Sequence, residues 1–148
     1  MKDIRKSRYN LAICARNVTD DLKEAIQVFM QSSLKGVDKV LVYHEDWHNS
    51  IALTIGECST TNRILLEPLV NDIVMCCESF VRITQANTIR LSLKMVNHDT
   101  FRKFHIDGYT HRLLCSYYDP GTEWVDNDNR KYLGVGENED IIRDWTAI

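Results

Sequence analysis

His105 and Asp107 are the two residues of this chain whose type and spacing best suit metal chemistry. Residues two apart in an extended segment point to the same face, so the imidazole and the carboxylate converge while Phe104 and Ile106 face the other side. An imidazole nitrogen and a carboxylate oxygen suit Fe(II), Mn(II) or Zn(II) and form two arms of a facial triad. Gly108 would let the chain turn just after these ligands. Alone, His-x-Asp is a weak motif, and the alternative is an exposed histidine beside a loop aspartate.

The third ligand must come from a distant strand or, within this segment, from His111. If the strand is unbroken, the side chain of His111 points to the same face as those of His105 and Asp107. This spacing is similar to the cupin metal motif. The intervening glycine argues against an unbroken strand. The alternative for His111 is therefore a surface residue beside Arg112.

Polar and aromatic residues that follow the motif are candidates for a substrate pocket. Arg112 could bind an anionic co-substrate, or it could pair with Glu123 across the turn, which contributes about 0–1 kcal/mol if the pair is exposed. Tyr117 and Trp124 could line the pocket, although aromatic core is the simpler interpretation. Thr122 completes this set of supporting residues.

A second motif, HEDWH, runs from His44 to His48 and formally matches H-E-x-x-H. In zinc peptidases the two histidines lie one helical turn apart and bind zinc, and the glutamate is the general base. Apolar residues at helical spacing allow a helix here, but residues 40–43 read equally well as a buried strand that ends at His44. Asp46 adds a charge that the motif normally lacks, and no third-ligand pattern follows. Two loop histidines are favoured, and zinc at His44, Glu45 and His48 is the lesser alternative.

The elements that must position these residues follow from the hydrophobic period. Steps of three and four residues predict helices from about Asp21 to Leu34 and from Pro68 to about Val81. Alternation from Ile89 to Met95 predicts a half-buried strand. Further strands are expected at Phe101–Ile106, His111–Tyr118 and Asp140–Trp145. Helices followed by strands predict an α+β fold, with N-terminal helices packed on an antiparallel sheet.

Composition limits the class of protein. The 148 residues suit a single domain, 1–148, and a net charge of -3 argues against non-specific nucleic-acid binding. No stretch approaches the roughly 20 apolar residues that span a bilayer, and the N-terminus lacks the apolar core of a signal peptide. The five cysteines form no CxxC pair, which favours reduced thiols. We therefore expect a cytoplasmic protein that binds neither membrane nor nucleic acid.

The run RLSLKMVNHDTFRKFHIDGYTHRLLCSYYDPGTEW, which ends at Trp124, resembles the bacterial family called domain of unknown function 1826. Looser resemblance extends to NLAICARNVTDDLKEAIQ near the start and LGVGENEDIIRDWTAI at the end, so it touches most of the chain. The specific part is residues 104–124. Its matching positions are Phe104, His105, Asp107, Arg112, Leu113, Leu114, Cys115, Tyr117, Pro120, Gly121, Thr122, Glu123 and Trp124.

The His-x-Asp segment is also similar, more distantly, to the iron- and 2-oxoglutarate-dependent oxygenases. That resemblance implies a partial double-stranded β-helix of the jelly-roll or cupin type, Fe(II) and 2-oxoglutarate as cofactors, and oxidation of an unidentified small molecule. Another divalent metal remains open. The competing hypothesis is a non-catalytic remnant or protein-interaction module of the same fold.

The family resemblance also implies a chain truncated at its C-terminal end. Relatives continue with further strands and a later histidine, whereas this sequence ends at Ile148. The distal histidine and a basic residue for 2-oxoglutarate would then be missing. A truncated sheet leaves open edges, so we expect a homo-oligomer that pairs through those edges.

Overall fold

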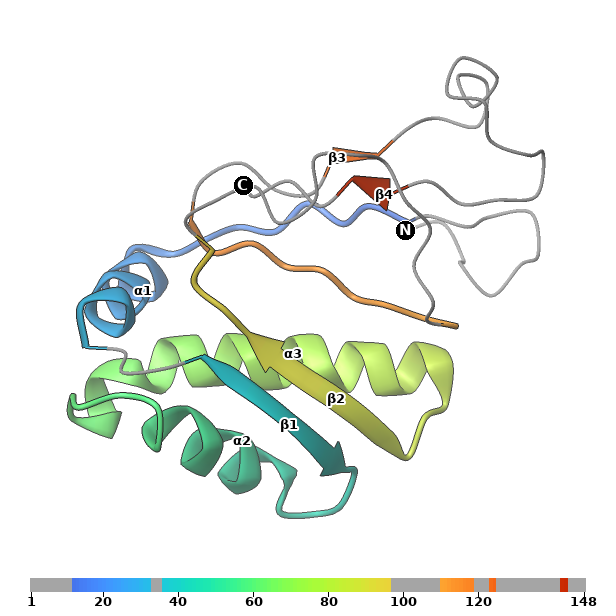
Figure 1. Cartoon of the computed structure of the whole chain (residues 1–148), viewed down its shortest axis with the longest axis horizontal. Coiled ribbons are helices and arrows are strands. Elements are labelled where there is room, and N and C mark those ends of the chain that lie inside the picture. The colour runs from blue at the N-terminus through green and yellow to red at the C-terminus, as the bar shows by residue number, and fades with distance from the viewer. Residues whose placement is uncertain (1–11, 33–35, 97–109, 119–122, 125–141, 144–148) are drawn as a thin grey trace. The chain divides into compact units, whose positions relative to one another are not determined.

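The computed structural model describes residues 12–32, 36–96, 110–118, 123–124 and 142–143 (Figure 1). The chain divides into two compact units, residues 1–95 and 96–148, and each is described by itself. The first unit contains α1 (Asp20–Ser32), β1 (Val37–Val42), α2 (Trp47–Gly56), the 3-10 helix η1 (Arg63–Leu66), α3 (Glu67–Thr84) and β2 (Thr88–Leu93). In the second unit, β3 (Glu123–Trp124) pairs antiparallel with β4 (Ile142–Arg143).

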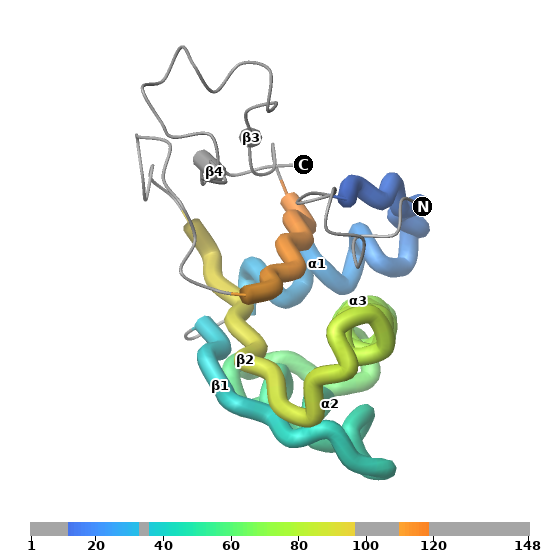
Figure 2. Tube along the Cα trace, turned by 90° about the vertical axis from the view of Figure 1, so that its right-hand side faces the viewer, coloured from blue at the N-terminus to red at the C-terminus, as the bar shows by residue number. Residues whose placement is uncertain are grey.

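The first unit is a two-stranded antiparallel sheet with helices on one face. β1 and β2 are far apart in sequence but pair along their whole length, from Val37 opposite Leu93 to Val42 opposite Thr88. Figures 1 and 2 both show α2 and α3 on the same side of this pair. Val37 and Ile89 are buried, so the face that they share is the one against the helices.

The helices begin and end where local chemistry satisfies their backbone. Thr19, rather than either of the aspartates after it, caps α1, because its Oγ1 accepts a hydrogen bond from the N–H of Leu22 at 3.3 Å. α3 has a proline in its first turn and ends at Thr84, and the next residue, Gln85, adopts a left-handed conformation with φ 59°. The N–H of Gln85 donates to the carbonyl of Val81 at 2.7 Å.

One core joins the elements of the first unit. The side chains of Ile51 and Ile55 on α2 are fully buried. α1 and α3 contribute buried stripes at helical spacing, which on α1 are Leu22, Ala25, Ile26 and Phe29 and on α3 are Leu69, Val70, Ile73, Val74 and Cys77. Within the described residues, no helix is long and apolar enough to cross a membrane.

The α+β class expected from the sequence is confirmed, and so are the two predicted helices and the strand that begins near Ile89. The predicted order, helices followed by strands, is wrong, because β1 lies between α1 and α2. The strand predicted at residues 111–118 is not formed. The adjacent pairs Leu113–Leu114 and Tyr117–Tyr118 interrupt the alternation that a strand requires, and no described strand pairs with this segment.

The other predicted strands have different outcomes. β4 places Ile142 and Arg143 of the strand expected at 140–145 in a strand, and the other residues of that range lie outside the described residues. The strand expected at 101–106 lies outside the described residues. A single domain over 1–148 stays a prediction.

Candidate functional site

The residues of the His-x-Asp hypothesis belong to the second unit. His105, Asp107 and Thr122 lie outside the described residues. His111 and Arg112 are exposed, whereas Tyr117 is half-buried. The proposed roles of these three residues stay predictions.

The strand pair of the second unit includes two of the supporting residues. Glu123 and Trp124 form β3, in which Glu123 faces Arg143 and Trp124 faces Ile142. The pairing of Arg112 with Glu123 stays a prediction.

The HEDWH segment forms a strand–turn–helix junction. β1 ends at Val42 and α2 begins at Trp47, so His44 precedes the helix that contains His48. The N–H of Asp46 donates to Nδ1 of His44 at 3.1 Å, and Nε2 of His44 lies 3.2 Å from Oγ of Ser50. The geometry of a zinc peptidase needs both histidines on one helix, and that geometry is not formed here.

The second histidine of HEDWH contacts α3. Nε2 of His48 lies 2.8 Å from Oδ1 of Asn71. Beside it is a hollow of about 210 Å³ between α2, η1 and α3, with mostly apolar walls and with Arg63 and Glu67 among its lining residues. The contact with Asn71 gives His48 a structural role, because it joins α2 to α3.

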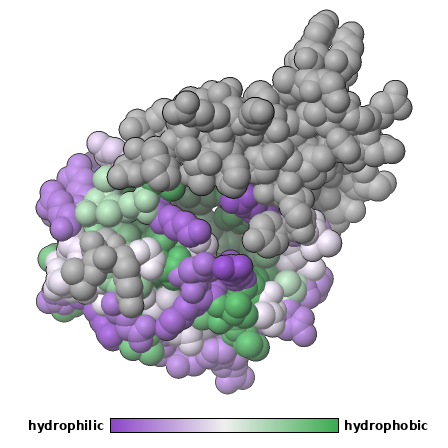
Figure 3. All heavy atoms as spheres, in the orientation of Figure 1, coloured by the Kyte–Doolittle hydropathy of each residue, from purple (hydrophilic) through white to green (hydrophobic). Residues whose placement is uncertain are grey.

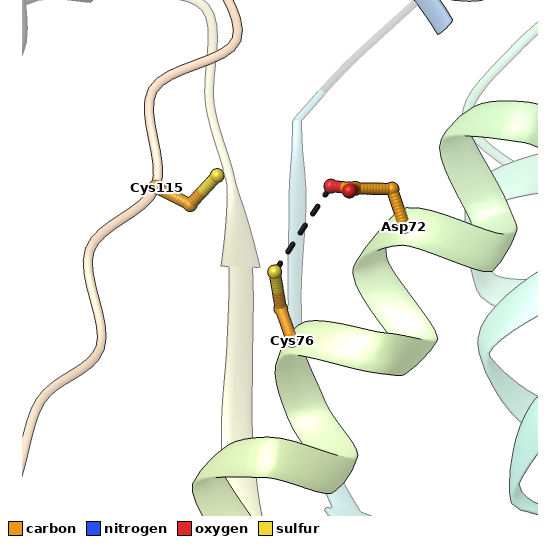
Figure 4. A group of neighbouring side chains, drawn as sticks. All are labelled: Asp72, Cys76 and Cys115. Atoms are coloured by element: carbon orange, nitrogen blue, oxygen red, sulfur yellow. Dashed lines mark hydrogen bonds between the residues drawn. The ribbon is translucent and has the colours of Figure 1, made fainter. Parts of the chain in front are cut away.

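A polar cluster that sequence reasoning missed lies on α3. Asp72 and Cys76 are one helical turn apart, as Figure 4 shows, and Sγ of Cys76 lies 4.0 Å from Oδ2 of Asp72. Nη1 of Arg16 donates to both carboxylate oxygens of Asp72, at 2.7 and 2.6 Å, and to Sγ of Cys76 at 3.3 Å. The i, i+4 spacing of Asp72 and Cys76 was visible in the sequence, but nothing local indicated that Arg16 would join them. The cluster holds the segment before α1 against α3.

The thiols of the first unit differ in environment. None of the five cysteines forms a disulfide, and Cys14 is exposed whereas Cys58 and Cys77 are buried. Burial, with a smaller contribution from Glu78, raises the pKa of Cys77 to about 11. A thiol with that pKa is almost entirely protonated near neutral pH, so Cys77 is a core residue and not a nucleophile.

Comparison with known proteins identifies the family. No curated protein and no solved structure matches the chain. The model of one family, described as protein of unknown function (DUF1826), matches residues 1–147 and so covers both units and the His-x-Asp segment. The chain therefore belongs to the DUF1826 family of proteins of unknown function.

Proposed function

We propose that this chain binds a divalent first-row metal through His105 and Asp107 and functions as a mononuclear oxygenase of the Fe(II)/2-oxoglutarate type. One observation carries the proposal. His-x-Asp stands at the start of the segment 104–124, the part of the chain with the most specific family resemblance. The family match over residues 1–147 supports that resemblance.

The chemistry of the donor set fits such a metal. A neutral imidazole and a carboxylate are two of the three ligands of a 2-His-1-carboxylate triad, which leaves positions open for a co-substrate. The third ligand would be His111 or a residue from another part of the assembly. Fe(II), with 2-oxoglutarate as reducing co-substrate and O2 as oxidant, would supply the oxidising power for attack on a C–H bond of a small molecule, and 2-oxoglutarate would leave as succinate and CO2.

The chain's own groups have defined tasks in this proposal. His105 ligates only when its imidazole is unprotonated, so protons compete with the metal. Arg112 would hold the carboxylate of the co-substrate, since a guanidinium matches carboxylate geometry. The surrounding fold would be a partial double-stranded β-helix, and the antiparallel β3–β4 pair supports a sheet of antiparallel strands in the second unit.

A second candidate is a protein-interaction module. The observation that favours it is the sheet of the first unit, whose β1 edge has no neighbouring strand among the described residues. An open edge is a site for pairing with another chain.

Turnover of the co-substrate separates an oxygenase from a protein that only binds metal. We expect the chain to convert 2-oxoglutarate to succinate slowly in the presence of Fe(II) and oxygen, and we expect no conversion in His105→Ala or Asp107→Ala. Glu45→Gln is the matched control, because it changes the other motif and should leave turnover unchanged. If metal binds but no succinate forms, the oxygenase proposal is wrong.

A further inference from the structure

The outer edge of β1 carries main-chain groups without partners among the described residues. The N–H of Tyr43 donates to the carbonyl of Asn87 at 2.8 Å and so extends the β1–β2 ladder by one residue. In an antiparallel ladder, successive residues turn their N–H and C=O to opposite sides. The N–H and C=O of Tyr43 point toward β2. Those of Asp38, Val40 and Val42, at odd-numbered steps from Tyr43, therefore point toward the outer edge of β1. No strand and no recorded hydrogen bond occupies that edge in the described part of the chain.

The side chains along this edge do little to prevent pairing. Val40 and Val42 are 67% and 59% exposed on the sheet face that points away from the helices. Proteins commonly protect an open edge with proline, a bulge or unpaired charges. β1 contains neither proline nor glycine, and its two charges are paired within the chain.

Those two charges are Asp38 and Lys39. Nε and Nη2 of Arg90 donate to the two carboxylate oxygens of Asp38, both at 2.7 Å. This bond holds the pKa of Asp38 below its ordinary value. Nζ of Lys39 lies 2.9 Å from Oε2 of Glu57, at the end of α2. Figure 3 shows hydrophobic and hydrophilic side chains interspersed on the described face that points toward the viewer.

We propose that two copies of this chain pair antiparallel through β1, with Val40 of one copy facing Val40 of the second copy across a two-fold axis. The result is a continuous sheet in the order β2–β1–β1–β2. A two-fold interface uses the same patch twice, so the edge must be complementary to itself. The inference is independent of the proposed metal site, because its residues all lie in the first unit.

Side-chain direction selects this register. The helices of both copies lie on the same face of the continuous sheet only if even-numbered residues of one β1 lie opposite even-numbered residues of the other. An axis at Lys39 would set two ammonium groups opposite each other, which is unfavourable. An axis at Leu41 would pair only residues 40–42 of β1. An axis at Val40 pairs residues 38–42 and brings the main-chain groups of Asp38, Val40 and Val42, which point toward the outer edge, into hydrogen-bonded pairs.

Disulfide trapping tests the register. Cα atoms of a hydrogen-bonded antiparallel pair are about 5.5 Å apart, which is within the range that a disulfide spans. Val40→Cys should therefore give a covalent dimer under mild oxidation, seen by mass on a non-reducing gel. Val42→Cys is the matched control. In this register the two cysteines at position 42 are four residues apart along the strands, which is about 13 Å and too far for a disulfide. The unsubstituted chain gives the background from its own five cysteines.

Solution mass tests the dimer itself. By light scattering over a dilution series, the unsubstituted chain should be a dimer that dissociates on dilution. Val40→Lys should be a monomer at every concentration, since it sets two charges opposite each other on the axis. Ser92→Lys, on the outward face of β2, should remain a dimer. A monomeric unsubstituted chain, or equal trapping of Val40→Cys and Val42→Cys, would overturn the proposal.

Discussion

Replacing Ile51 by alanine is expected to lower the free energy of unfolding by about 2–5 kcal/mol. Ile51 is fully buried on α2, where its side chain is part of the core beneath the sheet. The substitution removes apolar contacts and leaves a cavity that the surrounding side chains fill only in part. Urea denaturation followed by circular dichroism should show a lower midpoint with an unchanged slope.

Leu53→Ala is the matched control on the same helix. Leu53 is 48% exposed, so its truncation removes less buried surface and leaves no enclosed cavity. The midpoint should move much less than it does for Ile51→Ala. Equal shifts for the two variants would contradict the described core.

Replacing Asp72 by alanine is the second large change that we expect, with a loss of about 1–3 kcal/mol in the free energy of unfolding. The Asp72 and Arg16 side chains are 11% and 25% exposed, so the pair is partly shielded from water. Without the carboxylate, the guanidinium of Arg16 loses two short charge-assisted hydrogen bonds. The urea midpoint at low salt is the appropriate measurement.

The exposed ion pair of Lys23 with Asp20 provides the comparison for Asp72. Nζ of Lys23 lies 2.7 Å from Oδ1 of Asp20, but both side chains are largely exposed. Exposed pairs contribute little to stability, so Lys23→Gln should leave the midpoint almost unchanged. If Asp72→Ala has as little effect as Lys23→Gln, the Arg16–Asp72 contact does not stabilise the first unit.

Periodicity predicted the elements whose buried stripe is long. α1 and α3 repeat apolar residues over several turns, and both were predicted to within a few residues of each end. The sequence left a helix around HEDWH open, because the apolar residues there fit both a helix and a strand; the structure forms α2 from Trp47 to Gly56. The apolar run before it suggested a buried strand, and β1 is a strand, but Val40 and Val42 are exposed, so the expected burial is wrong.

Contacts between distant segments were beyond the reach of sequence patterns. The pairing of β1 with β2 and the contact of Arg16 with Asp72 both join residues at least 46 positions apart. Local spacing contains no information about such partners. Conversely, the HEDWH match showed that a motif depends on its structural context, since the start of α2 at Trp47 separates its two histidines. The His-x-Asp site rests on residue type, parity and family resemblance, and it remains a prediction.

Anaerobic titration of the chain with Fe(II) and Mn(II), beside His105→Ala and Asp107→Ala, tests the metal site most directly. We expect saturable binding of one metal ion per chain that both substitutions abolish, because each removes one of the donors. His44→Ala should bind as the unsubstituted chain does, since that histidine belongs to the strand–turn–helix junction. Absent binding, or binding that neither substitution weakens, would contradict a metal site at His105 and Asp107.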